Sequence, residues 1–377
     1  MAVTGHRDCA PARGRRPIAL VLRALGLGDL LTGVPAMRAL RRGLPGHEIV
    51  LAAPAPLGAL FPLLGAVDRL YPLPGLEPLR PPGPRPDIAV DLHGCGPRSH
   101  EVLWRLRPRR LLAFAHPAYP DAGAPPWRQE EHEVDRWCRL VTAYGFAADS
   151  GDLDLLPPRR PSPVPGAVVL HPGAKHGARR WPPARFAAVA ILLRTEGYRV
   201  VITGNRDETD LANSIALAAD IPACDVLAAR TDLAELAAVV AEARLLVSND
   251  TGIAHLATAC GTPSVVIFGP VPPSLWGPPP GRPRHVALWA GHRGSPFGTE
   301  PDPGLLEITV QDVMAGTRAA LAAAAGPAGD AGPAGDAGPA GGAGPGDAEL
   351  AGDAGLTGDA GMRAALPVGS TAGEGAA

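Results

Sequence analysis

Apolar and polar residues alternate along the chain in blocks that predict strands followed by helices. The run IALVLRAL (18–25) has strand length, and residues 30–44 carry apolar side chains at helical spacing. EIVLAA (48–53) predicts a second strand, and a helix is expected over residues 57–64. Strands that alternate with helices are typical of a parallel sheet with both faces covered.

The alternation of predicted strands and helices is interrupted once by a proline-rich segment and then continues. VDRLYPL (67–73) and DIAVDLHG (87–94) predict further strands, and residues 130–146 predict a helix. The proline-rich segment PPRRPSPVPG (157–166) then has the composition of a linker, because proline removes ladder donors and stiffens the backbone. In the second half we expect strands over 167–173, 198–204, 244–250 and 264–270, and helices over 182–197, 207–219, 231–243 (with Thr231 as its cap), 251–261 and 310–325.

These elements predict an α/β protein with two Rossmann-like domains. The expected division is a disordered leader (1–16), an N-terminal domain (17–156), the linker (157–166), a C-terminal domain with a final helix (167–325) and a disordered tail (326–377). The tail is Gly-, Ala-, Pro- and Asp-rich and cannot bury enough apolar surface to fold. Its short Gly-every-third-residue repeat favours a flexible segment over a collagen-like triple helix.

Composition excludes several classes of function. The 35 basic and 37 acidic residues nearly cancel, which argues against nucleic-acid binding. No apolar run is long enough to span a membrane, and no secretory signal is expected. The five cysteines are scattered without a CxxC pair, so we expect a cytoplasmic protein with neither a disulfide framework nor a zinc site.

The first candidate for chemistry is Gly26-Leu27-Gly28-Asp29, directly after the first strand. Glycines let a ligand approach the backbone closely, so Gly28 is a candidate binding residue. A dinucleotide fingerprint needs a third glycine or alanine where Leu31 stands, which argues against NAD. From its position Asp29 is either a helix cap or a general base at the edge of a cleft.

Two further candidate loops follow strands of the second half. In His171–Pro182, Gly173, Lys175 and Arg179 suit a phosphate before a helix, although a solvated basic loop is the alternative. The loop SNDTGIAH (248–255) supplies the second set of candidates. Asp250 could bind sugar hydroxyls, and Thr251 and Gly252 could bind a diphosphate at the helix start. His255 is the last candidate, and the alternative is that it is a half-buried helix histidine without a role in binding. A single DTG in an α/β pattern argues against an aspartic protease.

Asp91 and His93, at the end of a strand in the first half, are weaker candidates for acceptor-side contacts. A metal site would need more ligands at suitable spacing than they provide, so no metal site is expected.

The collinear set of motifs resembles glycosyltransferase family 9, whose best-known members are ADP-heptose:lipopolysaccharide heptosyltransferases. The resemblance runs from about residue 18 to about residue 325. Six segments show the resemblance: RALGLGDLLTGVPAMRAL, DIAVDLHGCGPRS, EHEVDRWCRLVTAYG, HPGAKHGARRWPPARFAAVA, VVITGNRDE and VSNDTGIAHLATACGTPSVVIFGP. It implies a GT-B architecture, in which the parallel sheets of two Rossmann-like domains face a central cleft.

The resemblance also implies roles for individual residues. Asp29 corresponds to the general base of an inverting, metal-independent sugar transfer, and Arg179 stands where the family usually carries a phosphate-binding lysine. Asp250, Thr251 and Gly252 match the donor-binding DTG, and His255 matches its histidine.

The implied partners are a nucleotide-sugar donor, usually ADP-heptose, and a glycan or glycolipid acceptor such as the lipopolysaccharide core. No cofactor is expected, and peripheral contact with a lipid-linked acceptor is left open. The alternatives are a transferase or epimerase of this fold that uses a UDP- or GDP-sugar, and a non-catalytic protein that binds sugar nucleotides.

Overall fold

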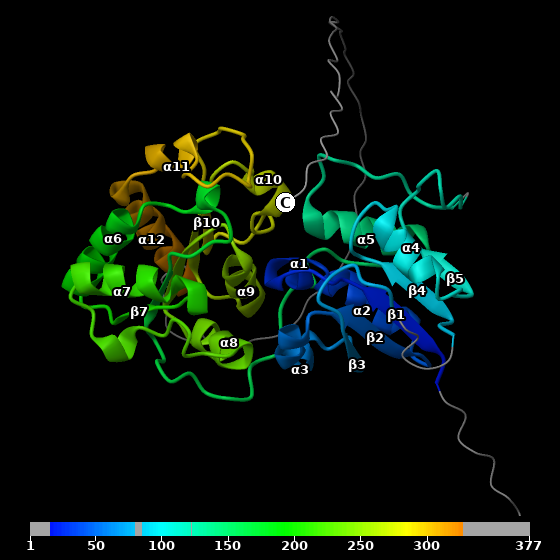
Figure 1. Cartoon of the computed structure of the whole chain (residues 1–377). Coiled ribbons are helices and arrows are strands. Elements are labelled where there is room, and N and C mark those ends of the chain that lie inside the picture. Colours follow the sequence, from blue (N-terminus) through cyan, green and yellow to red (C-terminus); the bar gives the residue numbers. More distant parts are fainter. Residues whose placement is uncertain (1–15, 80–84, 122, 327–377) are drawn as a thin grey trace, which may run out of the picture. The chain divides into compact units, whose positions relative to one another are not determined.

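The computed structural model describes residues 16–79, 85–121 and 123–326, and these form two five-stranded parallel sheets with helices packed on them (Figure 1). The predicted α/β class and GT-B type of fold are confirmed. The predicted leader before Arg16 and the predicted tail beyond Gly326, with its glycine repeat, lie outside the described residues.

The first sheet has the strand order β3-β2-β1-β4-β5. Its strands are β1 (Ile18–Leu22), β2 (Glu48–Ala53), β3 (Arg69–Pro72), β4 (Ile88–Asp91) and β5 (Arg110–Leu112). The order reverses between β1 and β4, which pair in parallel with Leu22 beside Asp91.

The second sheet has the order β10-β9-β8-β6-β7. Its strands are β6 (Val168–His171), β7 (Val200–Ile202), β8 (Leu245–Asn249), β9 (Ser264–Ile267) and β10 (His285–Leu288). Here the order reverses between β6 and β8, with His171 beside Ser248. In open α/β sheets, ligands bind beyond the carboxyl ends of the strands at such a reversal.

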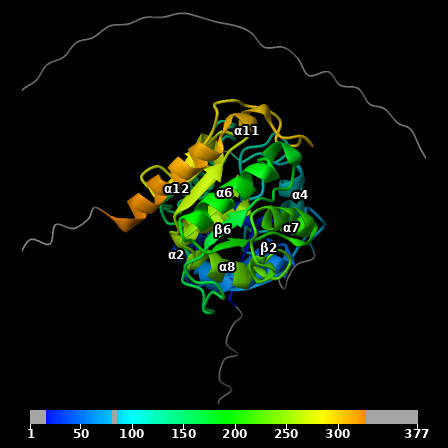
Figure 2. The same ribbon diagram turned by 90° about the vertical axis from the view of Figure 1, so that its left-hand side faces the viewer.

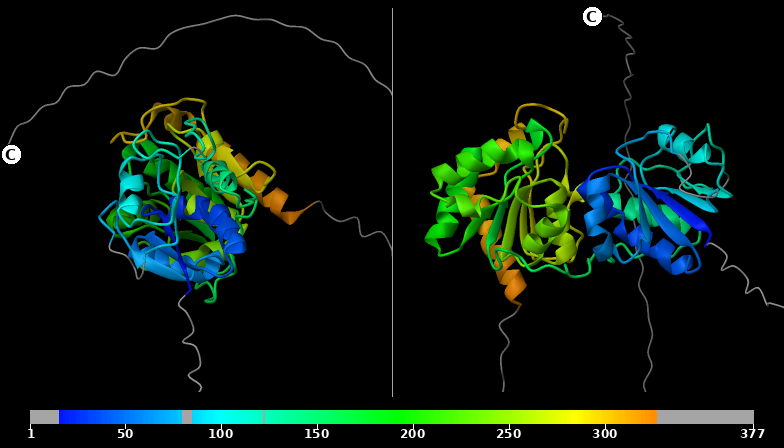
Figure 3. Two further views of the ribbon diagram at one scale, coloured as in Figure 1. Left: turned by 90° about the vertical axis from the view of Figure 1, so that its right-hand side faces the viewer. Right: turned by 60° about the horizontal axis from the view of Figure 1, so that its bottom comes forward.

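Helices cover both faces of each sheet. The α-helices are α1 (Leu27–Thr32), α2 (Val34–Gly43), α3 (Phe61–Leu64), α4 (Arg98–Trp104), α5 (Glu133–Ala143), α6 (Pro183–Thr195), α7 (Thr209–Ala218), α8 (Leu233–Ala241), α9 (Gly252–Cys260), α10 (Pro273–Trp276), α11 (Pro303–Glu307) and α12 (Val310–Ala325). On the second sheet, α6, α7 and α12 share one face and α8 and α9 the other (Figures 2 and 3). Of the helices described, none combines the length and apolarity needed to cross a bilayer.

Alternation of side chains along the central strands builds the core. In β1, Ala19 and Val21 face α2 and α5, whereas Leu20 and Leu22 face α4. Every residue of β1 and β8 is buried, as expected for a central parallel strand. The apolar cluster that contains Ala19 continues into the second half through Ile253 and Leu256 of α9.

Several elements differ from their sequence-based predictions. The helix expected over 30–44 begins at Leu27 and divides at Gly33 into α1 and α2. The helix expected over 57–64 begins as a 3-10 helix (Ala55–Leu60) and ends as the short α3. Asp232, not Thr231, caps α8, because its carboxylate accepts the backbone N–H of Glu235 at 2.8 Å. The short β5, β10, α4, α10 and α11 were not predicted.

The N-terminal ends of α1 and α9 touch, so the two halves meet there (Figure 1). Two glycines permit this approach. A Cβ on Gly252 would lie 2.9 Å from the Cβ of Leu27 and 3.1 Å from the backbone nitrogen of Gly28. A Cβ on Gly28 would lie 2.8 Å from Cδ2 of His255. Neither gap has room for a methyl group, so the close contact depends on glycine at both positions.

Gly252→Ala is therefore expected to destabilise the protein. Overpacking a close contact typically costs about 1–3 kcal/mol, and here backbone atoms would have to move. The free energy of unfolding is measured by urea titration beside Gly46→Ala, where an added Cβ meets nothing within 4 Å. If the two variants unfold alike, the contact between α1 and α9 is not a tight one.

Candidate functional site

A pocket of about 1070 Å³ lies between the two halves, beyond the carboxyl ends of their strands. Its size matches the upper range of ligand sites. The first half contributes residues 25–29, and the second contributes the segments after β6, β7, β8, β9 and β10 and the start of α8. Of the predicted site residues, Gly28, Asp29, Lys175, Arg179, Thr251, Gly252 and His255 line this pocket.

Asp29 lies in the first turn of α1, and its side chain is 28% exposed. Oδ2 accepts the backbone N–H of Gly26 at 3.2 Å, and Oδ1 lies 3.9 Å from Nη2 of Arg23. The carboxylate thus supports the helix start and also borders the pocket, so the two alternatives considered for it are compatible. Its remaining lone pairs are open to a ligand hydroxyl.

The loop after β6 carries the predicted cations. Lys175 is exposed at the pocket, whereas Arg179, on a 3-10 turn, donates from Nη2 to the carboxylate of Asp250. The Nε of Arg179 is buried and has no hydrogen-bond partner among the residues that the structure describes. Arg180 donates to the carbonyl oxygen of Ala174 at 2.7 Å and so fixes the loop.

The loop after β8 leads directly into α9. Thr251 is the N-cap of α9, but its side chain makes no capping hydrogen bond, and within the described residues no side chain accepts from the N–H groups of Gly252 and Ile253. Such a helix start can bind an anion. Asp250, predicted for sugar hydroxyls, is instead buried beneath the pocket wall and paired with Arg179.

His255 projects from the first turn of α9 toward α1. Its ring packs edge-on against Trp276, with the centroids 5.9 Å apart. Burial holds the pKa of His255 below its usual value, although the charges of Asp250 and Asp29 oppose this shift. Burial therefore favours the neutral imidazole, which can donate or accept a hydrogen bond with a ligand.

Asn249, at the end of β8, joins the two loops of the second half. Its Oδ1 accepts the backbone N–H of Trp181 at 3.0 Å, and its Nδ2 donates to the carbonyl oxygen of Pro172 at 2.7 Å. One buried amide thus fixes the loop that carries Arg179 relative to the loop that starts α9.

Glu208 and His171 also line the pocket, and sequence reasoning gave them no role. Glu208 lies against Gly173, where an added Cβ would sit 2.0 Å from its Oε1. Its Oε2 accepts the backbone N–H of Asn205 at 2.8 Å. Burial lowers the pKa of His171, whose Nδ1 lies 2.9 Å from the hydroxyl of Thr203. The segment GNRDE could have indicated the position of Glu208. Its Asn precedes its Glu by three residues, and this spacing after a strand predicts a capping box.

Asp91 and His93 do not line the pocket. Asp91 is fully buried, and its two oxygens accept the backbone N–H of His93 at 2.9 Å and contact Nδ1 of His100 at 2.8 Å. Burial lowers the pKa of His93. This arrangement supports the loop after β4. Within the described ranges, no three His, Cys, Asp or Glu residues gather as ligands for a metal ion.

Comparison with known proteins agrees with this geometry. Residues 126–297 match the model of glycosyltransferase family 9 (heptosyltransferase). The chain is 28% identical to lipopolysaccharide heptosyltransferase 2 of Escherichia coli (strain K12) over 218 residues, which cover 56% of this chain and 60% of that relative. The chain therefore aligns with about three-fifths of that relative's length.

Solved structures extend the likeness in fold. A family 9 glycosyltransferase from Veillonella parvula superposes with a TM-score of 0.67 at 18% identity, covering 82% of this chain and 98% of the other. The E. coli ADP-heptose lps heptosyltransferase II superposes with a TM-score of 0.65 at 21% identity, covering 81% and 99%. Together with the sequence matches, these findings confirm the resemblance given by the motifs: the chain is similar to glycosyltransferase family 9 (heptosyltransferase) in sequence and shares the fold of solved members.

Proposed function

We propose that this chain is an inverting glycosyltransferase that moves a heptose from ADP-heptose to a saccharide hydroxyl without a metal ion. The relatives' names supply the sugar and the nucleotide. One observation carries the proposal: the carboxylate of Asp29 and the open helix start of α9 border the same pocket from opposite halves. The first suits a base, and the second suits a diphosphate.

In the proposed reaction, the acceptor oxygen attacks the anomeric carbon of the heptose as Asp29 takes the hydroxyl proton. The bond from that carbon to the diphosphate oxygen breaks, and ADP leaves with the electron pair. Attack opposite the leaving group inverts the configuration at the anomeric carbon. A positioned base of this kind contributes about 10²–10⁴-fold to the rate.

The second half supplies groups for the charge that develops on the leaving diphosphate. These are the N–H groups of Gly252 and Ile253, the ammonium of Lys175 and the donors of Arg179 that Asp250 does not use. Fixed donors in a partly enclosed site stabilise such charge without reorganisation. That distribution of groups favours chemistry in this pocket over binding alone.

The acceptor in this proposal is a sugar of the lipopolysaccharide core, by analogy with the names of the relatives. A UDP- or GDP-sugar transferase remains the alternative, because the helix start and cations recognise the diphosphate and not the base. A protein that only binds sugar nucleotides would make no use of Asp29, so variants of that residue separate the two.

Asp29→Asn is expected to lower kcat by about 10²–10⁴-fold while ADP affinity stays within about twofold. The amide keeps the shape of the side chain but cannot take the proton. Transfer from ADP-heptose to heptose-free lipopolysaccharide is followed by mass spectrometry in the presence of EDTA. Asp210→Asn is the matched control, because Asp210 also lies in a first helical turn but outside the pocket. Full turnover by Asp29→Asn would rule out the base, and loss of wild-type turnover in EDTA would rule out metal independence.

Arg179→Ala is expected to weaken ADP binding by about 10–100-fold, the equivalent of a charge-assisted hydrogen bond of about 1.5–3 kcal/mol. The change removes a cation and leaves the Asp250 carboxylate unpaired near the diphosphate. Calorimetry compares it with Arg199→Ala, which breaks a similar ion pair with Asp225 outside the pocket. If both variants bind ADP equally well, Arg179 does not contact the phosphates.

A further inference from the structure

Arg23 is a completely buried arginine in the segment between β1 and α1. All of its nitrogens are engaged. Nε donates to the carbonyl oxygen of Asp29, and Nη1 donates to that of Leu92. Nη2 donates to Oγ1 of Thr32 at 2.9 Å and to Oε1 of Glu133 at 3.3 Å. One guanidinium therefore joins the turn after β1, the loop after β4 and the start of α5.

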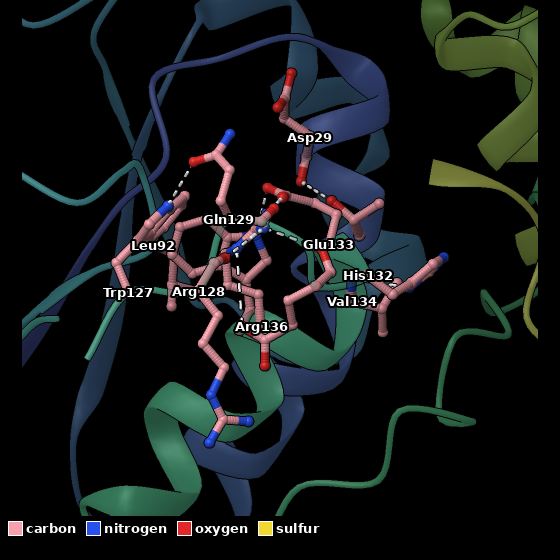
Figure 4. Close-up of polar contacts among 12 residues, drawn as sticks. Asp29, Leu92, Trp127, Arg128, Gln129, His132, Glu133, Val134 and Arg136 are labelled. Atoms are coloured by element: carbon pink, nitrogen blue, oxygen red, sulfur yellow. Dashed lines mark hydrogen bonds and ion pairs between the residues drawn. The ribbon is translucent and has the colours of Figure 1, made fainter. Parts of the chain in front are cut away.

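Glu133 lies between two buried guanidinium groups. Its Oε1 accepts from Arg23 and, at 2.8 Å, from the indole N–H of Trp137, while its Oε2 accepts from Arg136. Arg136 also donates to the carbonyl oxygens of Arg128 (3.1 Å), Gln129 (3.2 Å) and Glu131 (3.0 Å), which anchors the segment before α5 (Figure 4). Arg23 and Arg136 stack on the rings of Trp137 and Trp127 at 4.6 and 4.3 Å.

Glu133 alone does not balance the two guanidinium charges that contact it. Glu131 lies 4.0 Å from Nε of Arg136 but is already bound through both oxygens by Arg139 at 2.6 Å, so the further negative charge beside Arg23 comes from Asp29, 3.9 Å from its Nη2. Buried charge is costly unless it is paired. Asp29 is thus the partner of this cluster that also borders the pocket, and in Figure 4 its carboxylate points away from Glu133.

A glycine in the backbone between α1 and α2 makes room for Arg23 to reach Asp29. A Cβ on Gly33 would lie 3.1 Å from Cδ of Arg23 and 3.2 Å from its Nε, so the arginine passes beneath the break between α1 and α2. Thr32 contributes to the same contact, since its hydroxyl donates to the carbonyl oxygen of Asp29 at 3.0 Å. Asp29 is therefore held through its main chain by two side chains and through its carboxylate by one.

We propose that Arg23 is a positioning residue that sets the place and orientation of the Asp29 carboxylate at the pocket. This inference rests on the proposed function, because it assigns Asp29 the role of base. Arg23 is buried and does not line the pocket, so it acts through Asp29. A displacement of about 1 Å in a catalytic group can cost about 10²-fold in rate. Loss of the guanidinium should therefore reduce kcat without changing the affinity for the donor.

The test compares kcat, the KM for ADP-heptose and the Kd for ADP in three variants and one control variant. Arg23→Met should lower kcat by about 10²-fold, with both constants within about twofold of the wild type. Arg23→Lys should recover part of that loss, because the charge remains while the fork of donors does not. Thr32→Val should lower kcat by about 2–10-fold, since it removes one hydroxyl and keeps the shape.

Arg38→Met is the matched control. Arg38 is also mostly buried in the first half and donates to the carbonyl oxygens of Leu64, Asp152 and Asp154 and to the carboxylate of Asp152. Among the described residues it has no hydrogen bond or ion pair to α1, and it does not line the pocket. Its loss should lower the unfolding temperature and leave kcat unchanged. If Arg38→Met reduces kcat as much as Arg23→Met does, the effect of Arg23 is general destabilisation and the inference fails.

A double-mutant cycle separates this inference from the proposed function. In the Asp29→Asn background, Arg23→Lys should cause no further loss of the residual turnover, because the base that it positions is gone. Additive losses would overturn the positioning role even if Asp29 is the base. Full turnover by Asp29→Asn alone would instead overturn the proposed function. Should Arg23→Met fail to fold, Arg23→Lys and Thr32→Val still decide the question.

Discussion

The contact between the start of α1 and the start of α9 is the constraint on which the site depends. Each helix follows a central strand next to the point where its sheet reverses strand order, so the turns before them are the natural binding positions of both sheets. Gly28 and Gly252 allow these two turns to approach within backbone distance. The pocket between the halves is formed by this approach, with a carboxylate on one wall and an open helix start on the other.

Each wall is fixed by a buried polar group behind it. In the second half, Asn249 ties the loop carrying Arg179 to the start of α9. In the first half, Arg23 ties the first turn of α1 to the loop after β4 and to α5. Buried polar groups of this kind are stable only when their hydrogen bonds are satisfied, and they then hold a single arrangement. The surface that meets a ligand is therefore more rigid than its loop character alone would imply.

The strand and helix pattern was sufficient to predict the fold, because the spacing of apolar residues over a short stretch of sequence identifies buried parallel strands and amphipathic helices. It missed β5, β10, α4, α10 and α11, which are short and depend on neighbours distant in sequence. It placed Asp29 and the loop after β8 at the pocket, since both follow central strands. It did not predict that Asp250 turns inward to Arg179, because partners 71 residues apart leave no local pattern. The role of Arg23 was hidden for the same reason, since Glu133 lies 110 residues away.

The most direct test of the account is calorimetric titration of the whole chain with ADP, UDP, GDP and NAD in the presence of EDTA. We expect ADP to bind more tightly than the other three, because all four share the diphosphate contacts and the rest of the pocket is proposed to fit an ADP-linked donor. Equal or stronger binding of UDP, GDP or NAD would contradict the proposed donor. Failure of every nucleotide to bind would contradict the assignment of the pocket itself.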